Sequence, residues 1–106
     1  MEAPEPPAFT PEMQEIAALA KALGHPARVA IVRVLQARTC CTVGELVAGL
    51  PFSQSTVSQH LQELTKAGLV SKAGGPGPGY CLNPQRWNQT LTLLGGLFHE
   101  LDHATP

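Results

Sequence analysis

The chain has 106 residues, of which 43% are hydrophobic, and its formal net charge is -1. This length suits one compact domain and is short for two. The near-neutral charge argues against a protein that coats nucleic acid indiscriminately, because nonspecific binding depends on many Lys and Arg contacts to phosphate. No apolar run approaches the ~18 residues of a membrane span, and the N-terminus does not resemble a signal peptide. We therefore expect a cytoplasmic protein with no membrane partner.

The first part of the chain predicts a flexible arm followed by two helices. Residues 1–9 are rich in proline and have little to bury, so we expect the folded domain over residues 10–103. Thr10 can cap a helix, Pro11 suits its first position, and Gly24 is expected to end it. A second helix should follow, because five apolar residues then recur at helical spacing on one face. These are Ala27, Ala30, Ile31, Val34 and Leu35.

Two further helical segments come next, separated by a tight connection. Thr42 and Glu45 form the T-x-x-E pattern of a capping box, which predicts the start of a third helix that ends near Pro51. A fourth helix is expected over about residues 53–67. Its buried face should carry Val57, Leu61 and Leu64. A helix, a tight turn and a second helix in this order predict a helix-turn-helix.

The end of the chain predicts a β-hairpin and one long helix. Residues 69–72 and 80–82 are short strand candidates on either side of a Gly-Pro loop, so residues 69–83 predict a wing-like hairpin. Asn83 and Pro84 can start a last helix, whose apolar residues recur at spacings of four and three. These are Trp87, Leu91, Leu94, Phe98 and Leu101. Such a seam predicts a partner helix, and the whole pattern predicts a mainly α fold of five helices with a small β-hairpin wing, a winged helix-turn-helix.

The face of the fourth helix opposite its apolar residues is polar and nearly uncharged. Such side chains can read base edges in the major groove, because Gln pairs with adenine and Ser or Thr contacts bases or phosphates. A solvated surface helix has a similar composition, and it is the order of helix, turn, helix and wing that favours DNA binding. The candidate DNA-binding residues are Ser55, Thr56, Ser58, Gln59, Gln62 and Lys66, with Lys72 in the wing. Other cations that could meet phosphate are Arg28, Arg33, Arg38 and Arg86.

Three segments of the chain carry motifs in a recognisable order. They are residues 22–28 (Ala-Leu-Gly-His-Pro-Ala-Arg), residues 55–64 (Ser-Thr-Val-Ser-Gln-His-Leu-Gln-Glu-Leu) and residues 67–70 (Ala-Gly-Leu-Val). Together they resemble the ArsR/SmtB family of winged-helix repressors, from about Ile16 to the last helix. The resemblance implies a homodimer formed through the first and last helices, repression through double-stranded operator DNA, and release of the DNA when an inducer binds. His25 and His60 lie inside these motifs, and we interpret both as structural.

Three cysteines are the candidate sensing residues. An odd number does not fit a secreted disulfide framework, and in a reducing compartment we expect them as thiols. In winged helices the segment before the third helix commonly pairs with the second wing strand, which would bring Cys40 and Cys41 beside Cys81. Three converging thiols suit As(III) or Sb(III) as the inducer, because soft centres prefer thiolate ligands. Zinc would need a fourth ligand and fits less well, and no permanently bound cofactor is expected.

Two other interpretations of these cysteines stay open. Cys40 and Cys41 could form a vicinal disulfide, or one could be oxidised to sulfenic acid and resolved by the other. Either reaction would make the protein a sensor of peroxide or of the thiol redox state. Alternatively, the three cysteines are small hydrophobic residues without function, since free Cys is often buried.

Other functional classes fit the sequence less well. His99, Asp102 and His103 lie on one side of the last helix, and a solvated helix end explains them better than a metal site. An enzyme with a Cys nucleophile would need a base and an orienting group, which are not evident, so we do not expect an enzyme. A helical protein-interaction module without DNA would explain the leucine seam and would leave the glycine-rich wing unused.

Overall fold

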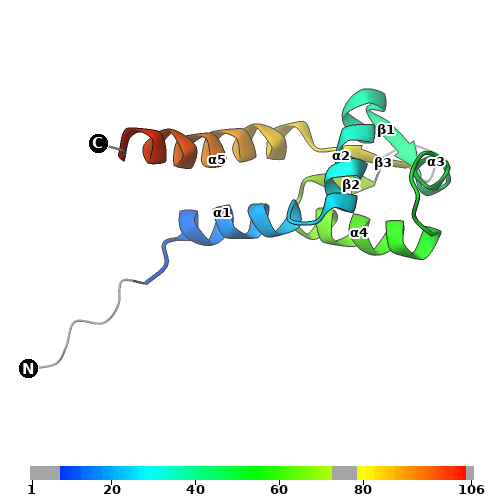
Figure 1. The fold of residues 1–106 in the computed structure, drawn as a ribbon, viewed down its shortest axis with the longest axis horizontal. Helices are drawn as coiled ribbons and strands as arrows, with labels where there is room; N and C mark the ends of the chain where they lie inside the picture. The colour runs from blue at the N-terminus through cyan, green and yellow to red at the C-terminus, as the bar shows by residue number, and fades with distance from the viewer. Residues whose placement is uncertain (1–7, 73–78, 105–106) are drawn as a thin grey trace, which may run out of the picture.

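The computed structural model describes residues 8–72 and 79–104, which form five helices and a three-stranded sheet (Figure 1). In chain order the elements are α1 (Pro11–Ala22), α2 (Pro26–Arg38), β1 (Cys40–Thr42), α3 (Val43–Gly49), α4 (Gln54–Lys66), β2 (Val70–Lys72), β3 (Gly79–Leu82) and α5 (Pro84–Ala104). The predicted winged helix-turn-helix architecture is confirmed. Residues 1–7 of the expected arm and 73–78 of the wing loop lie outside the described residues.

Side chains just before the first three helices satisfy backbone N–H groups that a first helical turn leaves without partners. Thr10 Oγ1 accepts from the third residue of α1 at 3.1 Å, and His25 Nδ1 accepts from the second residue of α2 at 3.0 Å. Thr42 and Glu45 form the predicted capping box, in which each side chain accepts from the other residue's N–H at 3.0 Å. Because these caps are local, the helix starts could be predicted from the sequence.

The hydrophobic core lies where α2 contacts α4 and the sheet. Its largest fully buried side chains are Leu19, Ile31, Leu35, Leu46, Val57, Leu61, Leu64, Leu69, Val70 and Cys41. The predicted buried face of α4 is confirmed. Helix α2 buries Val32 outside its predicted stripe, because it contacts both α4 and the strands β1 and β3.

The sheet is antiparallel with the order β1-β3-β2, so β3 pairs with both other strands. Strands β2 and β3 are the two strands of the predicted wing. Strand β1 precedes α3 and pairs with β3 in the register Cys40↔Cys81, Cys41↔Tyr80 and Thr42↔Gly79. The expectation that the segment before the third helix joins the second wing strand is therefore confirmed.

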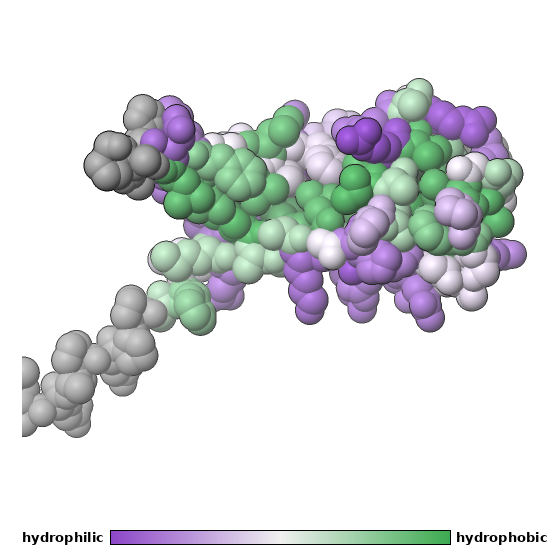
Figure 2. Space-filling view, in the orientation of Figure 1, coloured by the Kyte–Doolittle hydropathy of each residue, from purple (hydrophilic) through white to green (hydrophobic). Residues whose placement is uncertain are grey.

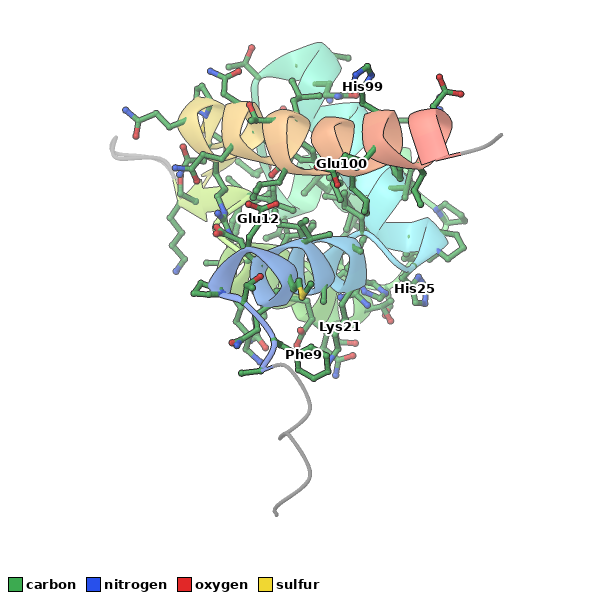
Figure 3. All side chains as sticks on the ribbon, turned by 90° about the vertical axis from the view of Figure 1, so that its left-hand side faces the viewer. Phe9, Glu12, Lys21, His25, His99 and Glu100 are labelled. Atoms are coloured by element: carbon green, nitrogen blue, oxygen red, sulfur yellow. A yellow bond between two sulfur atoms is a disulfide. The ribbon has the colours of Figure 1, made fainter. Side chains whose placement is uncertain are left out.

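Helices α1 and α5 lie side by side and extend away from the rest of the molecule (Figure 1). We call residues 8–17 and 91–104 the outer arm. Large apolar side chains of the outer arm are exposed, among them Phe9, Met13, Leu91, Phe98 and Leu101. Figure 2 shows the hydrophobic band that follows from this along the same end of the molecule, and Figure 3 views that end directly. None of the helices within residues 8–72 and 79–104 is long and apolar enough to cross a membrane.

Candidate nucleic-acid interface and cysteine pair

Helix α4 presents the polar face that the sequence predicted. Val57, Leu61 and Leu64 are fully buried, and the candidate residues lie on the flanks and on the opposite side of the helix. Of these, Ser55, Gln59, Gln62 and Lys66 are exposed, while Thr56 and Ser58 are half-buried. The structure therefore brings six of the seven candidate DNA-binding residues together on one helix, and Lys72 is exposed at the end of β2.

The side chains at the start of α4 form hydrogen bonds with one another, whereas those in its middle do not. Ser53 caps the helix by accepting from the Thr56 N–H at 3.3 Å, and its hydroxyl also bonds the Thr56 and Ser55 hydroxyls. In the middle of the helix, the side chains of Gln59 and Gln62 have no hydrogen-bond partner among the residues that the structure describes. Their amides are thus available to a ligand, and an amide can form two hydrogen bonds to an adenine edge.

The cations considered for phosphate contacts differ in how firmly other residues of the protein hold them. Lys66 forms a surface ion pair with Glu63 at 3.2 Å, which costs little to break. Arg38 pairs with Glu45 at 3.3 Å and lies beside β1. Arg86, named above as a cation for phosphate, instead hydrogen-bonds to protein acceptors on three elements. Lys66 and Lys72 are therefore the better candidates for phosphate contacts.

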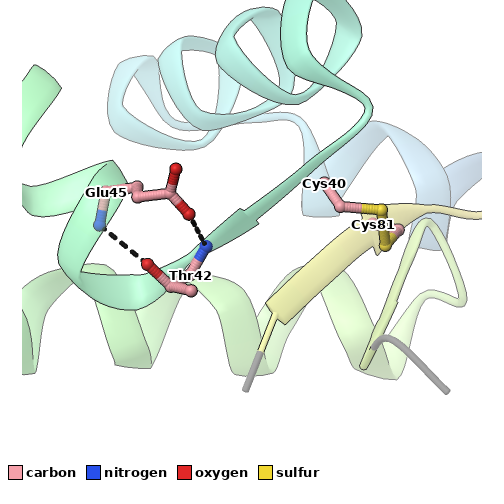
Figure 4. The surroundings of a disulfide bond; sticks show 4 residues. All are labelled: Cys40, Thr42, Glu45 and Cys81. Carbon is pink, nitrogen blue, oxygen red and sulfur yellow. Dashed lines mark hydrogen bonds between the residues drawn. A yellow bond between two sulfur atoms is a disulfide. The ribbon is translucent and has the colours of Figure 1, made fainter. Parts of the chain in front are cut away.

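Two of the three cysteines meet. Cys40 and Cys81 occupy directly opposed positions on β1 and β3, with their Cα atoms 4.2 Å apart, and their sulfur atoms form a disulfide (Figure 4). Opposed residues of neighbouring strands project from the same face of a sheet, so their Cβ atoms are close. The expectation of three resting thiols is wrong for this pair, and the partner of Cys40 is Cys81 rather than its neighbour Cys41.

Cys41 does not join the pair. Successive residues of a strand point to opposite faces, so Cys41 enters the core and is 1% exposed. Burial raises the pKa of the Cys41 thiol. The charge of Arg38 lowers this pKa by a smaller amount, and the charge of Glu45 raises it. Within residues 8–72 and 79–104, three or more His, Cys, Asp or Glu side chains nowhere gather closely enough to hold a metal ion.

The cysteine pair lies at a junction of the fold. Strand β1 has three residues and is the whole link between α2 and α3, apart from Thr39. Thr39 has φ 69°, a left-handed conformation that a β-branched residue rarely adopts. The Thr42–Glu45 capping box then holds the other end of β1 to α3 (Figure 4). A bond between Cys40 and Cys81 therefore ties the helix-turn-helix directly to the wing.

His25 and His60, which lie in the motifs shared with the ArsR/SmtB family, both make contacts inside the fold. His25 caps α2, and its ring lies 4.4 Å from the His60 ring, centroid to centroid. Desolvation lowers the pKa of His60, and the nearby charges of His25 and Arg28 lower it further, while Glu63 opposes them. A neutral His60 ring is thus favoured at this contact between α2 and α4.

Comparison with known proteins agrees with the fold and the motifs. A family model described as a helix-turn-helix domain matches residues 23–72. The chain is 44% identical over 64 residues to the biofilm growth-associated repressor of Agrobacterium fabrum, covering 60% of this chain and 54% of that protein. It therefore spans about half the length of this curated relative.

Solved structures resemble nearly the whole domain. A possible transcriptional regulator for arsenical resistance is 36% identical, with a TM-score of 0.66, and the match covers 79% of this chain and 88% of the other. An ArsR-like transcriptional regulator from Rhodococcus sp. RHA1 has a TM-score of 0.72 at 26% identity, with 86% of each chain covered. The fold defines a winged helix-turn-helix protein, and the chain belongs to the ArsR family of transcriptional regulators, which is not a family of enzymes.

Proposed function

We propose that this protein is a homodimeric repressor that binds operator DNA while Cys40 and Cys81 are reduced and releases it when they form a disulfide. Helix α4 would enter the major groove with its polar face toward the bases. Its contacts with base edges or phosphates would come from Ser55, Thr56, Ser58, Gln59 and Gln62, with Lys66 and Lys72 on the phosphates. The side-chain amides of Gln59 and Gln62 are exposed and have no partner within residues 8–72 and 79–104, which supports this assignment.

The outer arm supports the homodimer. Leu91 is 69% exposed and Phe98 is 61% exposed, and they lie on the seam predicted to need a partner helix. A second copy of the chain would remove these side chains from water at about 25 cal/mol per Å² of apolar surface. A twofold dimer would also present two α4 helices, one to each half-site of a palindromic operator.

The opposed positions of Cys40 and Cys81 are the observation that carries the redox proposal. A DNA-binding regulator works in the compartment that holds the DNA, where glutathione and thioredoxin keep most thiols reduced and a disulfide is usually transient or redox-sensing. Cys40 is exposed and Cys81 is half-buried, so an oxidant would reach Cys40 first. Cys41 is buried with a raised pKa, which keeps it as an unreactive thiol.

The proposed reaction with hydrogen peroxide has two steps. The Cys40 thiolate attacks one peroxide oxygen, the O–O bond breaks, and Cys40 becomes a sulfenic acid with release of water after protonation. The Cys81 thiolate then attacks the Cys40 sulfur, the S–O bond breaks as the S–S bond forms, and the departing hydroxide takes up a proton to become a second water. Two thiols are oxidised and one peroxide is reduced. The new bond ties β1 to β3 and would shift the dimer toward a form with lower affinity for DNA.

Fluorescence anisotropy on labelled DNA from upstream of the protein's own gene tests this function. The reduced wild type should bind, and peroxide in a thiol-free sample should release the DNA until a dithiol reductant restores binding. Cys40→Ser and Cys81→Ser should bind and resist release, whereas Cys41→Ser is the matched control and should still respond. Release of DNA from both serine variants by peroxide would contradict the redox proposal, and no specific DNA binding by the reduced wild type would contradict the repressor.

A second candidate inducer is As(III) or Sb(III). It is favoured by the likeness to a possible regulator for arsenical resistance and by the two thiolates that Cys40 and Cys81 would offer when reduced. Arsenite titrated in excess free thiol, without peroxide, should then release the DNA near one equivalent per site. Retention of this response in Cys41→Ser would limit the site to two cysteines, and its loss would restore the three-cysteine site. No release at stoichiometric arsenite would leave oxidation as the signal.

A further inference from the structure

Arg86 lies where three helices approach one another. Its side chain is 19% exposed, and its Nε donates to the Ala67 carbonyl oxygen at 2.8 Å. Its Nη1 donates to the Glu15 carboxylate and to Gln89 Oε1, the latter at 3.0 Å. One guanidinium therefore links α1 and α5 to the end of α4, the helix proposed to read DNA.

The contact with α4 is made at a group that the helix itself leaves without a partner. Ala67 is the C-cap of α4, and the last carbonyl oxygens of a helix have no intrahelical donor. A cation is also favoured at the negative end of the helix dipole. The next residue, Gly68, has φ +78°, and a Cβ there would lie 3.4 Å from Arg86 Cγ and Nε. The positive φ favours glycine at this turn, which brings the end of α4 into contact with the Arg86 side chain.

Helices α4 and α1 diverge at the surface beside this contact. A cleft of about 170 Å³ separates the two helices there. It is lined by Ala18, Lys21 and Ala22 of α1 and by Glu63, Lys66 and Ala67 of α4. A second cleft of about 430 Å³ lies between α1 and α5 beside Glu15 and Gln89. Arg86 therefore links the helices between two open clefts, in addition to the core packing of Leu19 and Ala22 of α1.

We infer that Arg86 is a positioning residue, which sets the distance of the recognition helix α4 from the dimer axis and so the half-site spacing that the dimer accepts. The inference rests on the proposed function, in which α1 and α5 form the dimer. The twofold axis then passes beside these helices, and the place of each α4 depends on how it is attached to them. Arg86 makes that attachment directly and does not itself contact phosphate.

The test uses operator DNA selected by the wild-type protein from a random library, with the half-site spacing then changed by one or two base pairs. Arg86→Met replaces the aliphatic part of the side chain with a similar unbranched chain and removes the guanidinium. It should reduce the preference for the selected spacing roughly 2- to 30-fold, the range expected for a lost coupling contact. The dependence of binding on salt concentration should stay as in the wild type, because no phosphate contact is lost.

Two further variants make the result decisive. Glu15→Gln keeps an acceptor oxygen but removes the charge, so it should change spacing preference in the same direction and by less. Lys66→Ala is the contrasting control, which should lower the salt slope by about one and leave the spacing preference unchanged. Circular dichroism identifies any variant that does not fold, in which case Glu15→Gln decides.

Three outcomes overturn or separate the claims. A salt slope reduced by about one in Arg86→Met would make Arg86 a phosphate contact and overturn the inference. An unchanged spacing preference in folded Arg86→Met and Glu15→Gln would also overturn it. Failure of the wild type to select any DNA would instead contradict the proposed function.

Discussion

The two ends of the molecule differ in how far their large apolar side chains are buried. The body, formed by α2, α3, α4 and the sheet, contains Ile31, Leu35, Leu46 and Leu61 with no exposed surface. The outer arm, residues 8–17 and 91–104, carries several large apolar residues. Among its described side chains, all are exposed or half-buried. The body therefore closes its core within one chain, and the outer arm has apolar surface suited to a second copy.

The largest expected effect lies in the body. Leu61→Ala should lower the free energy of unfolding by about 2–5 kcal/mol, because it leaves a cavity in a packed core. Leu91→Ala, on the outer arm, should change it by less than about 0.5 kcal/mol. Urea unfolding followed by Trp87 fluorescence, at dilutions that leave the chain monomeric, measures both. Equal losses of unfolding free energy in the two variants would contradict the difference between the body and the outer arm.

The next largest effect should appear in the dissociation constant of the proposed dimer. Phe98→Glu places a charge on the apolar face of the outer arm and should weaken the dimer at least about 100-fold, or about 2.7 kcal/mol. Sedimentation equilibrium measures the dissociation constant. Arg33→Glu, an exposed change in the body, is the control and should leave the dimer intact. A dimer equally stable in both variants would move the interface away from the outer arm.

The smallest effect concerns pH and belongs to the body. The folded pKa of His60 lies below its ordinary 6.5, so the unfolded chain takes up the proton first as the pH falls. The stability from neutral His60 is present above pH 6.5 and is lost as the pH falls below 6.5 through the lowered pKa.

Urea unfolding midpoints at pH 7.5, 6.5 and 5.5 measure this loss. His60→Gln should flatten the dependence over this range, because Gln does not titrate, although the charges of His25, Arg28 and Glu63 stay in place. Stability that is constant with pH in the wild type, or equally steep in the variant, would mean that His60 does not set the dependence.

Local signals made much of the fold predictable. Thr10, Thr42 and Ser53 precede helices that begin where their side-chain caps allow, and the spacing of Val57, Leu61 and Leu64 marked the buried face of α4. The pairing of β1 with β3 was predicted from the winged-helix pattern rather than from residue chemistry. The separation of Cys40 from Cys41 had a usable signal, because neighbouring residues in a strand point to opposite faces.

The sequence by itself determined the helix boundaries, the amphipathic recognition helix and the order of elements, since caps and periodicity act over three or four residues. Only the tertiary structure decided that Cys40 pairs with Cys81, and that Arg86 bonds Glu15, 71 residues away in the sequence. Such contacts depend on how whole helices and strands pack. Residue spacing along the chain carries no measure of that packing.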